Sequence, residues 1–395
     1  MKKSTLLRVS AIAVSLAFVT AACGSDSDSS VTEDTVASEV TEDTAATAAG
    51  VTCEPVSIAF FGALSGDAGN LGKNIRAGAD LAVSEFNTAN PDCQVGLVDF
   101  DSQGDPAQAP ALAQKAIDDA SILGIVGPAF SGESKAANPL FDAAGLAIIT
   151  PSATNATLND NNWKVFHRAL AGDQVQGAGI AAYIQKTLAA AKVGVIDDAS
   201  EYGKGLGDIV KSTLGDAVVA SDSIDPKAAD FSAAVSKMKD AAPDAIFYGG
   251  YYAEAGKLAK QLRDAGVTAT LVFGDGVKDG GFIEAAGPAA EGSIITCPCT
   301  DGSLLTEFAA AYTAKFPGET PQTYGAEAYD AAQAFLAAIA AGKTDRAGVL
   351  EFLGTYDAAG VTKQIKWDET GEVAATDIFA YKVEAGAIVY VGLIE

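Results

Sequence analysis

The stretch from Ile122 to Asn155 constrains the fold of this chain more than any other. It predicts a strand over residues 122–126, a helix over 133–144 and a second strand over 146–150, each strand followed by a loop. Both strands are short apolar runs, as expected for parallel strands that are covered on both faces. In such a strand–helix–strand unit the two loops lie side by side at the carboxyl edge of one sheet. The stretch therefore predicts an α/β fold.

Hydroxyl side chains occur in both of these loops. Ser131 lies in the first loop, and Ser152 and Thr154 lie in the second. Ser131 comes just before the expected helix, where free backbone N–H groups and the positive end of the helix dipole favour an anion. The two loops are thus a candidate seat for a carboxylate. The alternative is that Ser131 only caps its helix and that residues 151–154 form an ordinary turn.

Strands and helices also alternate on both sides of this stretch. Expected strands over residues 56–61 and 95–100, each followed by a helix, complete one doubly wound α/β lobe. From residue 174 the pattern starts again and continues to about residue 296, which predicts a second such lobe. A length of 395 residues also favours two lobes over one core. We expect a terminal antiparallel sheet of residues 365–367, 379–383 and 388–392 around a turn at 369–371.

Charge and motif content exclude several classes of function. The net charge of −25, from 51 acidic and 26 basic residues, argues against nucleic acid and anionic membrane surfaces as partners. One histidine, His167, rules out most catalytic triads and His-based metal sites. The Gly-rich segments 62–66 and 203–207 lack the dinucleotide spacing, no P-loop is present, and Ser131 lacks the first glycine of GxSxG. We therefore expect no enzyme activity, no cofactor and no metal.

The N-terminus reads as a targeting segment. Residues 1–22 combine basic residues, a short apolar core over 11–19 and small residues before Cys23, as in a secretory signal. The segment resembles a bacterial lipobox, although Thr20 stands where that motif usually has Leu. We expect Cys23 to be lipidated, which would hold the protein at the outer side of the bacterial cell membrane. The alternative is ordinary cleavage nearby with Cys23 unmodified. Residues 24–50, with seven acidic and no basic residues, predict a disordered tether.

Four further cysteines form an even set, as suits an oxidising compartment. Cys53 and Cys93 each lie just before an expected strand of the first lobe, so we expect them to bridge. Cys297 and Cys299 are close enough in an extended chain to form a small disulfide. Two cysteines alone make a poor metal site.

Seven short segments, taken together, resemble loops of the type I periplasmic binding proteins, specifically the Leu/Ile/Val-binding branch of ABC transporters. They are GALSG at 62–66, VGPAFS at 126–131, ITPSAT at 149–154, EYG at 201–203, YGGY at 248–251, GDG at 274–276 and AYD at 328–330. Each is weak alone, but seven in order over residues 56–392 are specific. The resemblance implies two Rossmann-like lobes, joined by a hinge of three crossing segments, that enclose a ligand. The implied parts are 1–22 (signal), 23–54 (tether), 55–171 with 301–359 (N-terminal lobe) and 172–300 with 360–395 (C-terminal lobe).

The same resemblance implies a role for each candidate site residue. Ser131 and Thr154 would hold the α-carboxylate of an amino acid, while the Ser152 carbonyl, the Thr154 hydroxyl and the Asp275 carboxylate would hold its α-ammonium group. Tyr202, Tyr251 and Tyr329 would close over the ligand side chain, and Leu71, Ala129 and Phe130 would line the floor. The scheme is physically sensible, because a zwitterion leaves water only if both charges find partners.

Departures from the family concern the ligand side chain. Family members often have Glu at the position of Asp275 and an aromatic residue at that of Leu71, and their first-lobe disulfide, at Gly104 and Phe130, is absent here. We expect a monomeric, extracytoplasmic receptor of an ABC importer that captures an amino acid, most readily a branched-chain one, and delivers it to a membrane permease. The alternatives are a ligand-sensing receptor domain, a binder of small amides or urea with the same fold, and an exported α/β enzyme.

Overall fold

The computed structural model describes residues 51–374 and 377–394. The expected signal peptide (1–22), the lipidation site Cys23 and the tether up to residue 50 lie outside the described residues. Within the described ranges, no helix combines the length and the apolar character needed to span a membrane.

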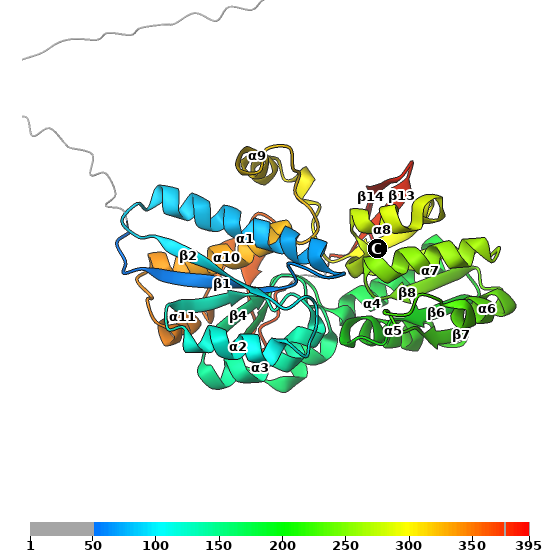
Figure 1. Cartoon of the computed structure of the whole chain (residues 1–395), viewed down its shortest axis with the longest axis horizontal. Helices are drawn as coiled ribbons and strands as arrows, with labels where there is room; N and C mark the ends of the chain where they lie inside the picture. Colours follow the sequence, from blue (N-terminus) through cyan, green and yellow to red (C-terminus); the bar gives the residue numbers. More distant parts are fainter. Residues whose placement is uncertain (1–50, 375–376, 395) are drawn as a thin grey trace, which may run out of the picture. The chain divides into compact units, whose positions relative to one another are not determined.

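The first lobe is built on a parallel sheet of five strands in the order β2-β1-β3-β4-β5 (Figure 1). Its strands are β1 (Val56–Gly62), β2 (Val95–Asp101), β3 (Ile122–Val126), β4 (Ala147–Thr150) and β5 (Phe166–Arg168). Helices cover both faces: α2 (Ala109–Asp118) and α3 (Ser131–Ala144) pack on one, and α1 (Gly69–Ala89) and α10 (Gly325–Ala340) on the other. Every residue of β3 and β4 is buried, which explains their uninterrupted apolar sequences.

The second lobe is built on a seven-stranded sheet in the order β14-β13-β10-β9-β8-β6-β7. Its strands are β6 (Val193–Asp197), β7 (Val218–Ser223), β8 (Ala245–Gly249), β9 (Thr270–Phe273), β10 (Ile294–Cys297), β13 (Phe379–Glu384) and β14 (Ala387–Leu393). Its helices are α4 (Asp173–Ala182), α5 (Glu201–Leu214), α6 (Ser232–Ala241), α7 (Tyr252–Asp264) and α8 (Gly280–Ala286). The strands from β6 to β10 are parallel, whereas β13 and β14 pair antiparallel. The predicted α/β fold with two parallel-sheet lobes is thereby confirmed.

The chain passes between the two sheets three times: after β5, after β10 and after β12 (Gln364–Lys366). Between the second and third crossings lie α9 (Thr306–Lys315), α10 and α11 (Arg346–Leu353), of which α10 packs closely on α1. Gly78 and Gly325 permit this approach, because a Cβ on Gly78 would lie 1.9 Å from the Gly325 carbonyl oxygen. The lobe boundaries at residues 171, 300 and 359 stay predictions.

The predicted terminal sheet is wrong in one strand. Only β13 and β14 form the expected antiparallel pair, and they extend the second sheet beside β10. Residues 364–366 pair instead with β11 (Asp357–Ala359). The reason lies in the turn that follows β12, where the Gly371 carbonyl accepts the backbone N–H of Arg168 and so directs this segment toward β5.

The described part of the chain contains two disulfides. Cys53 is joined to Cys93 and Cys297 to Cys299, with Cα atoms 4.7 Å and 5.0 Å apart. The first closes a loop that contains β1 and α1, and the second lies where the chain leaves β10.

Candidate functional site

One cavity gathers most of the sequence-predicted site residues. It is lined by Leu71, Ile75, Ala129, Phe130, Ser131, Ser152, Tyr202, Tyr251, Asp275, Gly276 and Tyr324. Its volume of about 10 Å³ leaves room for about one water molecule. Any ligand larger than a water molecule therefore enters only when the walls move apart. The described residues contain no group of three or more His, Cys, Asp or Glu side chains placed to share a metal ion.

The two hydroxyl loops of the first lobe are joined to each other by hydrogen bonds. Thr150 Oγ1 donates to the Pro128 carbonyl at 2.8 Å, and Ser152 Oγ donates to the Ala129 carbonyl at 2.7 Å. These bonds fix the loop after β3 against the loop after β4. The first-lobe wall of the cavity is therefore held in place by contacts within its own lobe.

Ser131 is the first residue of α3, and its side chain does not cap that helix. The residue before α3, Phe130, is extended and makes no side-chain cap. Ser131 Oγ instead accepts the backbone N–H of Asn155 at 3.2 Å, which ties the two loops together once more. The first N–H groups of a helix have no acceptor inside it, so this end of α3 presents donors and partial positive charge beside the cavity.

Asp275 brings the one formal charge among the lining residues. It is buried directly after β9, and it accepts hydrogen bonds from Tyr202 Oη at 2.6 Å and from Tyr324 Oη. Burial raises the pKa of Asp275, while the phenol hydrogen bonds lower it. Burial, together with the nearby Asp275 carboxylate, also raises the pKa of both phenols well above the usual value, so they stay protonated and donate.

Aromatic rings from both lobes meet over the cavity. The Tyr251 ring lies 5.4 Å from the Phe130 ring, edge to face, and 5.2 Å from the Tyr202 ring. These separations are typical of favourable aromatic pairs. Tyr251 and Tyr202 come from the second lobe and Phe130 from the first, so the three rings close one end of the cavity.

Two predicted site residues do not line the cavity. Thr154 is fully buried beside the carboxyl group of Asp173, behind the lining residues. The hydroxyl of Tyr329 donates to Glu85 Oε2 at 2.6 Å, and its ring packs on Phe308 at 5.4 Å. These contacts hold Tyr329 on the face of α10 that meets α1 and α9, away from the cavity.

Tyr324 occupies the place that was predicted for Tyr329. It precedes α10 with a left-handed backbone, φ +67°, and its hydroxyl reaches Asp275 from the first-lobe side. Ile75 of α1 is a further lining residue that sequence reasoning did not identify. Its place in the apolar repeat of α1 indicated burial but gave no reason to separate it from other core residues.

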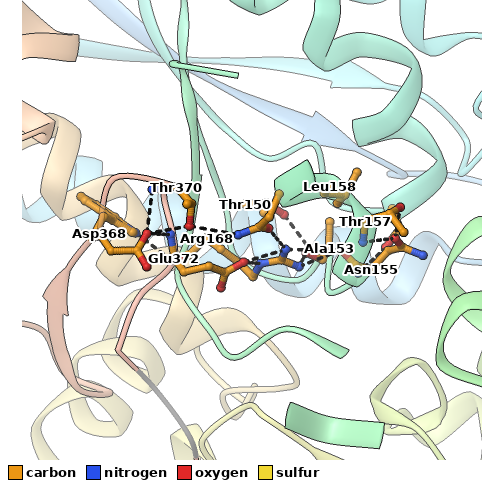
Figure 2. Close-up of polar contacts among 12 residues, drawn as sticks. Thr150, Ala153, Asn155, Thr157, Leu158, Arg168, Asp368, Thr370 and Glu372 are labelled. Carbon is orange, nitrogen blue, oxygen red and sulfur yellow. Dashed lines mark hydrogen bonds and ion pairs between the residues drawn. The ribbon is translucent and has the colours of Figure 1, made fainter. Parts of the chain in front are cut away.

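Arg168 supports the second hydroxyl loop from behind (Figure 2). Its guanidinium is fully buried and donates to the Ala153 carbonyl at 2.7 Å and to Glu372 Oε1 at 2.9 Å. It also donates to the Asn155 carbonyl at 3.3 Å. No role was predicted for Arg168 from the sequence, where the one signal is a cation that follows the hydrophobic residues Val165 and Phe166.

Contacts between the lobes continue outside the cavity. Lys135 Nζ lies 2.8 Å from Glu201 Oε1, and Asn155 Nδ2 donates to the Glu201 carbonyl at 2.6 Å. Between α1 of the first lobe and the start of α8 in the second, Asn70 Nδ2 donates to Asp279 Oδ1 at 3.0 Å. The cavity thus has polar contacts between the lobes on its rim, in addition to the Tyr324–Asp275 bond within it.

Known proteins resemble the chain over most of its length. Residues 55–387 match the periplasmic binding protein family. The Leu/Ile/Val-binding protein BraC3 of Rhizobium johnstonii is 31% identical, covering 85% of this chain and 93% of that protein. The leucine-specific-binding protein of Salmonella typhimurium is 28% identical, with the same coverage of 85% and 93%.

Solved structures are similar in fold as well. The branched-chain amino acid transporter substrate binding protein LivJ of Streptococcus pneumoniae, in complex with isoleucine, has a TM-score of 0.79 and 29% identity, covering 86% of this chain and all of that one. A solute binding protein of R. palustris in complex with benzoate has a TM-score of 0.76, covering 86% of this chain and 96% of that one. Its identity is 19%, so this second likeness concerns the fold alone.

Proposed function

Because the chain belongs to the periplasmic binding protein family and is a solute-binding protein of an ABC transporter rather than an enzyme, we propose that it captures an amino acid, of the branched-chain type, between its two lobes. The observation that carries this proposal is the charge of the cavity. Asp275 is buried and is the one carboxyl group among otherwise neutral lining residues, so a ligand with a positive group suits it. An unpaired buried charge costs several kcal/mol, whereas an ammonium group opposite Asp275 offsets that cost.

The opposite wall suits the carboxylate of the same ligand. Ser131 and the first N–H groups of α3 offer hydrogen-bond donors there, and Ser152 lies next to them. Thr154 lies one layer behind the lining, so it would contact the ligand only after the walls part. Each hydrogen bond to a charged group contributes about 1.5–3 kcal/mol. A zwitterion thus finds a partner for each of its charges on opposite sides of the cavity.

Apolar residues make up the remaining wall. Leu71, Ile75, Ala129 and Phe130 line it, with the rings of Tyr202 and Tyr251 above. Such a surface favours an aliphatic side chain over a polar one. The LivJ protein of Streptococcus pneumoniae, solved in complex with isoleucine, and the Leu/Ile/Val-binding protein BraC3 of Rhizobium johnstonii point to the same class of ligand.

An aromatic carboxylate is the second candidate ligand. The R. palustris protein of the same fold holds benzoate, and the aromatic rings of this cavity would suit such a ring. Benzoate has no positive group to pair with Asp275, however, and no Lys or Arg lines the cavity. The charge of the cavity therefore favours the amino acid.

The proposed role in transport extends to the cell surface. We place the protein outside the cytoplasm, held by a lipid at Cys23, where the ligand-closed form delivers its amino acid to a membrane permease as a monomer. The Leu/Ile/Val-binding relatives support a transport role, and the lipobox-like residues before Cys23 support the lipid. Sensing of the ligand for a signalling partner remains the alternative use of the same site.

A thermal-shift screen tests the proposal. The purified protein is melted with each of the twenty amino acids, small amides, urea and benzoate, and each hit is titrated by calorimetry. We expect leucine, isoleucine or valine to raise the melting temperature most, because a ligand that binds only the folded state stabilises it. A shift with benzoate or urea and none with any amino acid would contradict the proposal.

A further inference from the structure

Behind the cavity lies a buried cluster of oxygen atoms that the proposed function does not fully use. Asp173, the first residue of α4, is fully buried, and neither of its carboxyl oxygens has a hydrogen-bond partner among the described residues. Thr154 Oγ1 and Gln176 Oε1 are buried and lack a partner in the same way. Buried polar groups in proteins are almost always paired, so a group of this kind calls for an explanation.

These side chains form a link from Asp173 to the ligand site. The Asp173 N–H donates to the Thr154 carbonyl at 2.7 Å, and the Thr154 hydroxyl lies beside the Asp173 carboxyl group. Gln176 lies one turn further along α4, where its Nε2 donates to the Thr296 carbonyl at 3.2 Å and its amide group lies beside Asp275. Asp173 therefore lies near enough to Asp275 for the charge of each to act on the other, with the Thr154 hydroxyl beside Asp173 and the Gln176 amide group beside Asp275.

The charged and titratable groups around Asp173 come from several elements. Asp275 after β9 and Arg168 of β5 both act on its carboxyl group, and the Tyr202 phenol of α5 lies near it as well. Arg168 is engaged elsewhere, since its guanidinium donates to Glu372 and to two backbone carbonyls of the 153–155 loop. The described residues thus provide no cation that is dedicated to the Asp173–Asp275 pair.

We propose that Asp173 is a positioning residue of the ammonium site, acting through Thr154 and Asp275, and that its carboxyl group releases a proton to solvent when a ligand ammonium group binds. This inference rests on the proposed function, because it requires a ligand that carries a positive charge.

Two neighbouring carboxyl groups in a buried site cannot both be ionised at low cost. Asp275 is the one that stays charged, since it accepts hydrogen bonds from two phenols. Among the described residues, no phenol donates to Asp173 in this way; the hydroxyl near its carboxyl group is that of Thr154. Burial, followed by the nearby Asp275 charge, raises the pKa of Asp173 to about 8. An ammonium group beside Asp275 adds a positive charge, lowers the pKa of Asp173 and so drives its proton into solvent.

The sign of the pH dependence follows. Below about pH 8 the free protein holds a proton on Asp173 that ligand binding must release. Affinity therefore rises with pH from 6 to 8, by up to about tenfold per pH unit for one released proton. Above this range the free protein has already lost the proton, and the dependence levels off.

Calorimetric titration of the wild-type protein with leucine tests the inference. It is run at pH 7 in buffers of different ionisation enthalpy, which gives the number of protons released, and repeated from pH 6 to 8. We expect release of about one proton per leucine and a matching rise in affinity. In Asp173→Asn both effects disappear, although leucine still binds. Since the wild-type measurement stands alone, the inference is tested even if this variant does not fold.

Glu133→Gln is the matched control. Glu133 is also fully buried, and burial raises its pKa to about 8, but it accepts a hydrogen bond from Ser102 and does not line the cavity. This variant keeps the wild-type proton release. Leucine binding with no proton release, or an Asp173→Asn variant that keeps the wild-type pH slope, would overturn the inference and leave the proposed function intact. If no amino acid binds at any pH, both fall.

Discussion

The two walls of the cavity are built in opposite ways. The first-lobe wall consists of short hydroxyl side chains, the start of α3 and small or apolar groups, fixed by bonds such as that from Ser152 to the Ala129 carbonyl. The second-lobe wall consists of the rings of Tyr202 and Tyr251, the carboxyl group of Asp275 and the backbone of Gly276. The first wall is organised within its own lobe, whereas Asp275 gains its Tyr324 hydrogen bond only when the lobes meet. Under the proposed function, one lobe would offer a prepared seat for a carboxylate, and the other would bring the Asp275 charge on closure.

The largest effect is expected where the second wall carries its charge. Asp275→Asn keeps the shape of the side chain but removes the partner of the ligand ammonium group. Loss of one partner of a buried charge pair costs about 2–5 kcal/mol, so we expect the Kd for leucine to rise roughly 30-fold to several thousandfold. Calorimetric titration of the variant with leucine measures this rise in Kd.

Asp279→Asn is the control for this change. Asp279 follows Asp275 by four residues, contacts Asn70 on the rim and does not line the cavity. A rim contact of this kind contributes at most about 1 kcal/mol, so we expect less than about a sixfold change in Kd. If Asp275→Asn and Asp279→Asn lose affinity for leucine equally, the carboxyl group of Asp275 has no particular role in binding the ligand.

A smaller effect is expected on the first wall. Ser131→Ala removes one hydroxyl from the carboxylate seat and leaves the N–H groups of α3 in place. A hydrogen bond to a charged group contributes about 1.5–3 kcal/mol, which corresponds to a rise in Kd of roughly 10- to 150-fold. Ser134→Ala, one turn along α3, removes a hydroxyl that donates only to the Pro128 carbonyl and should leave Kd unchanged. If Ser134→Ala weakens binding as much, the seat does not depend on Ser131.

The smallest change in Kd is expected for Tyr324, just before α10, and it distinguishes this tyrosine from Tyr329 within α10. Tyr324→Phe removes one hydrogen bond from Asp275, which keeps its bond from Tyr202, so only part of the about 1.5–3 kcal/mol of a charged hydrogen bond is lost and we expect up to about a tenfold rise in Kd. Tyr329→Phe removes only the bond to Glu85 and should leave Kd at the wild-type value. Titration of both variants with leucine checks the assignment. A rise in Kd for Tyr329→Phe with no rise for Tyr324→Phe would indicate instead that Tyr329 belongs to the ligand site.

The sequence predicted those parts of the site whose positions follow from the succession of strands and loops along the chain. Ser131 and Ser152 follow neighbouring parallel strands, and loops of that kind must meet at one edge of a sheet. Tyr324 and Tyr329 could not be told apart in this way. Which of them faces Asp275 depends on the left-handed backbone at Tyr324 and on the packing of α10 against α1.

The Arg168 contacts and the last strands illustrate a second limit. Arg168 pairs with Glu372, 204 residues further along the chain, and no local pattern indicates such a partner. The same region explains the misplaced strand: residues 364–366 alternate in a way that suits any sheet edge, and their pairing with β11 follows from the turn whose Gly371 carbonyl meets the Arg168 N–H. Long-range pairings of this kind are set by the assembled lobes.

The Cys53–Cys93 disulfide has a mechanical consequence. It joins the chain just before β1 to the chain just before β2, and these strands are neighbours in the first sheet. Tension that arrives through the residues preceding Cys53 is therefore shared between two adjacent strands. Because β1 lies between β2 and β3, and β2 forms the sheet edge, pulling β1 out of the sheet would require β2 to detach at the same time. A protein attached to a surface through its N-terminus would therefore resist unfolding from that end.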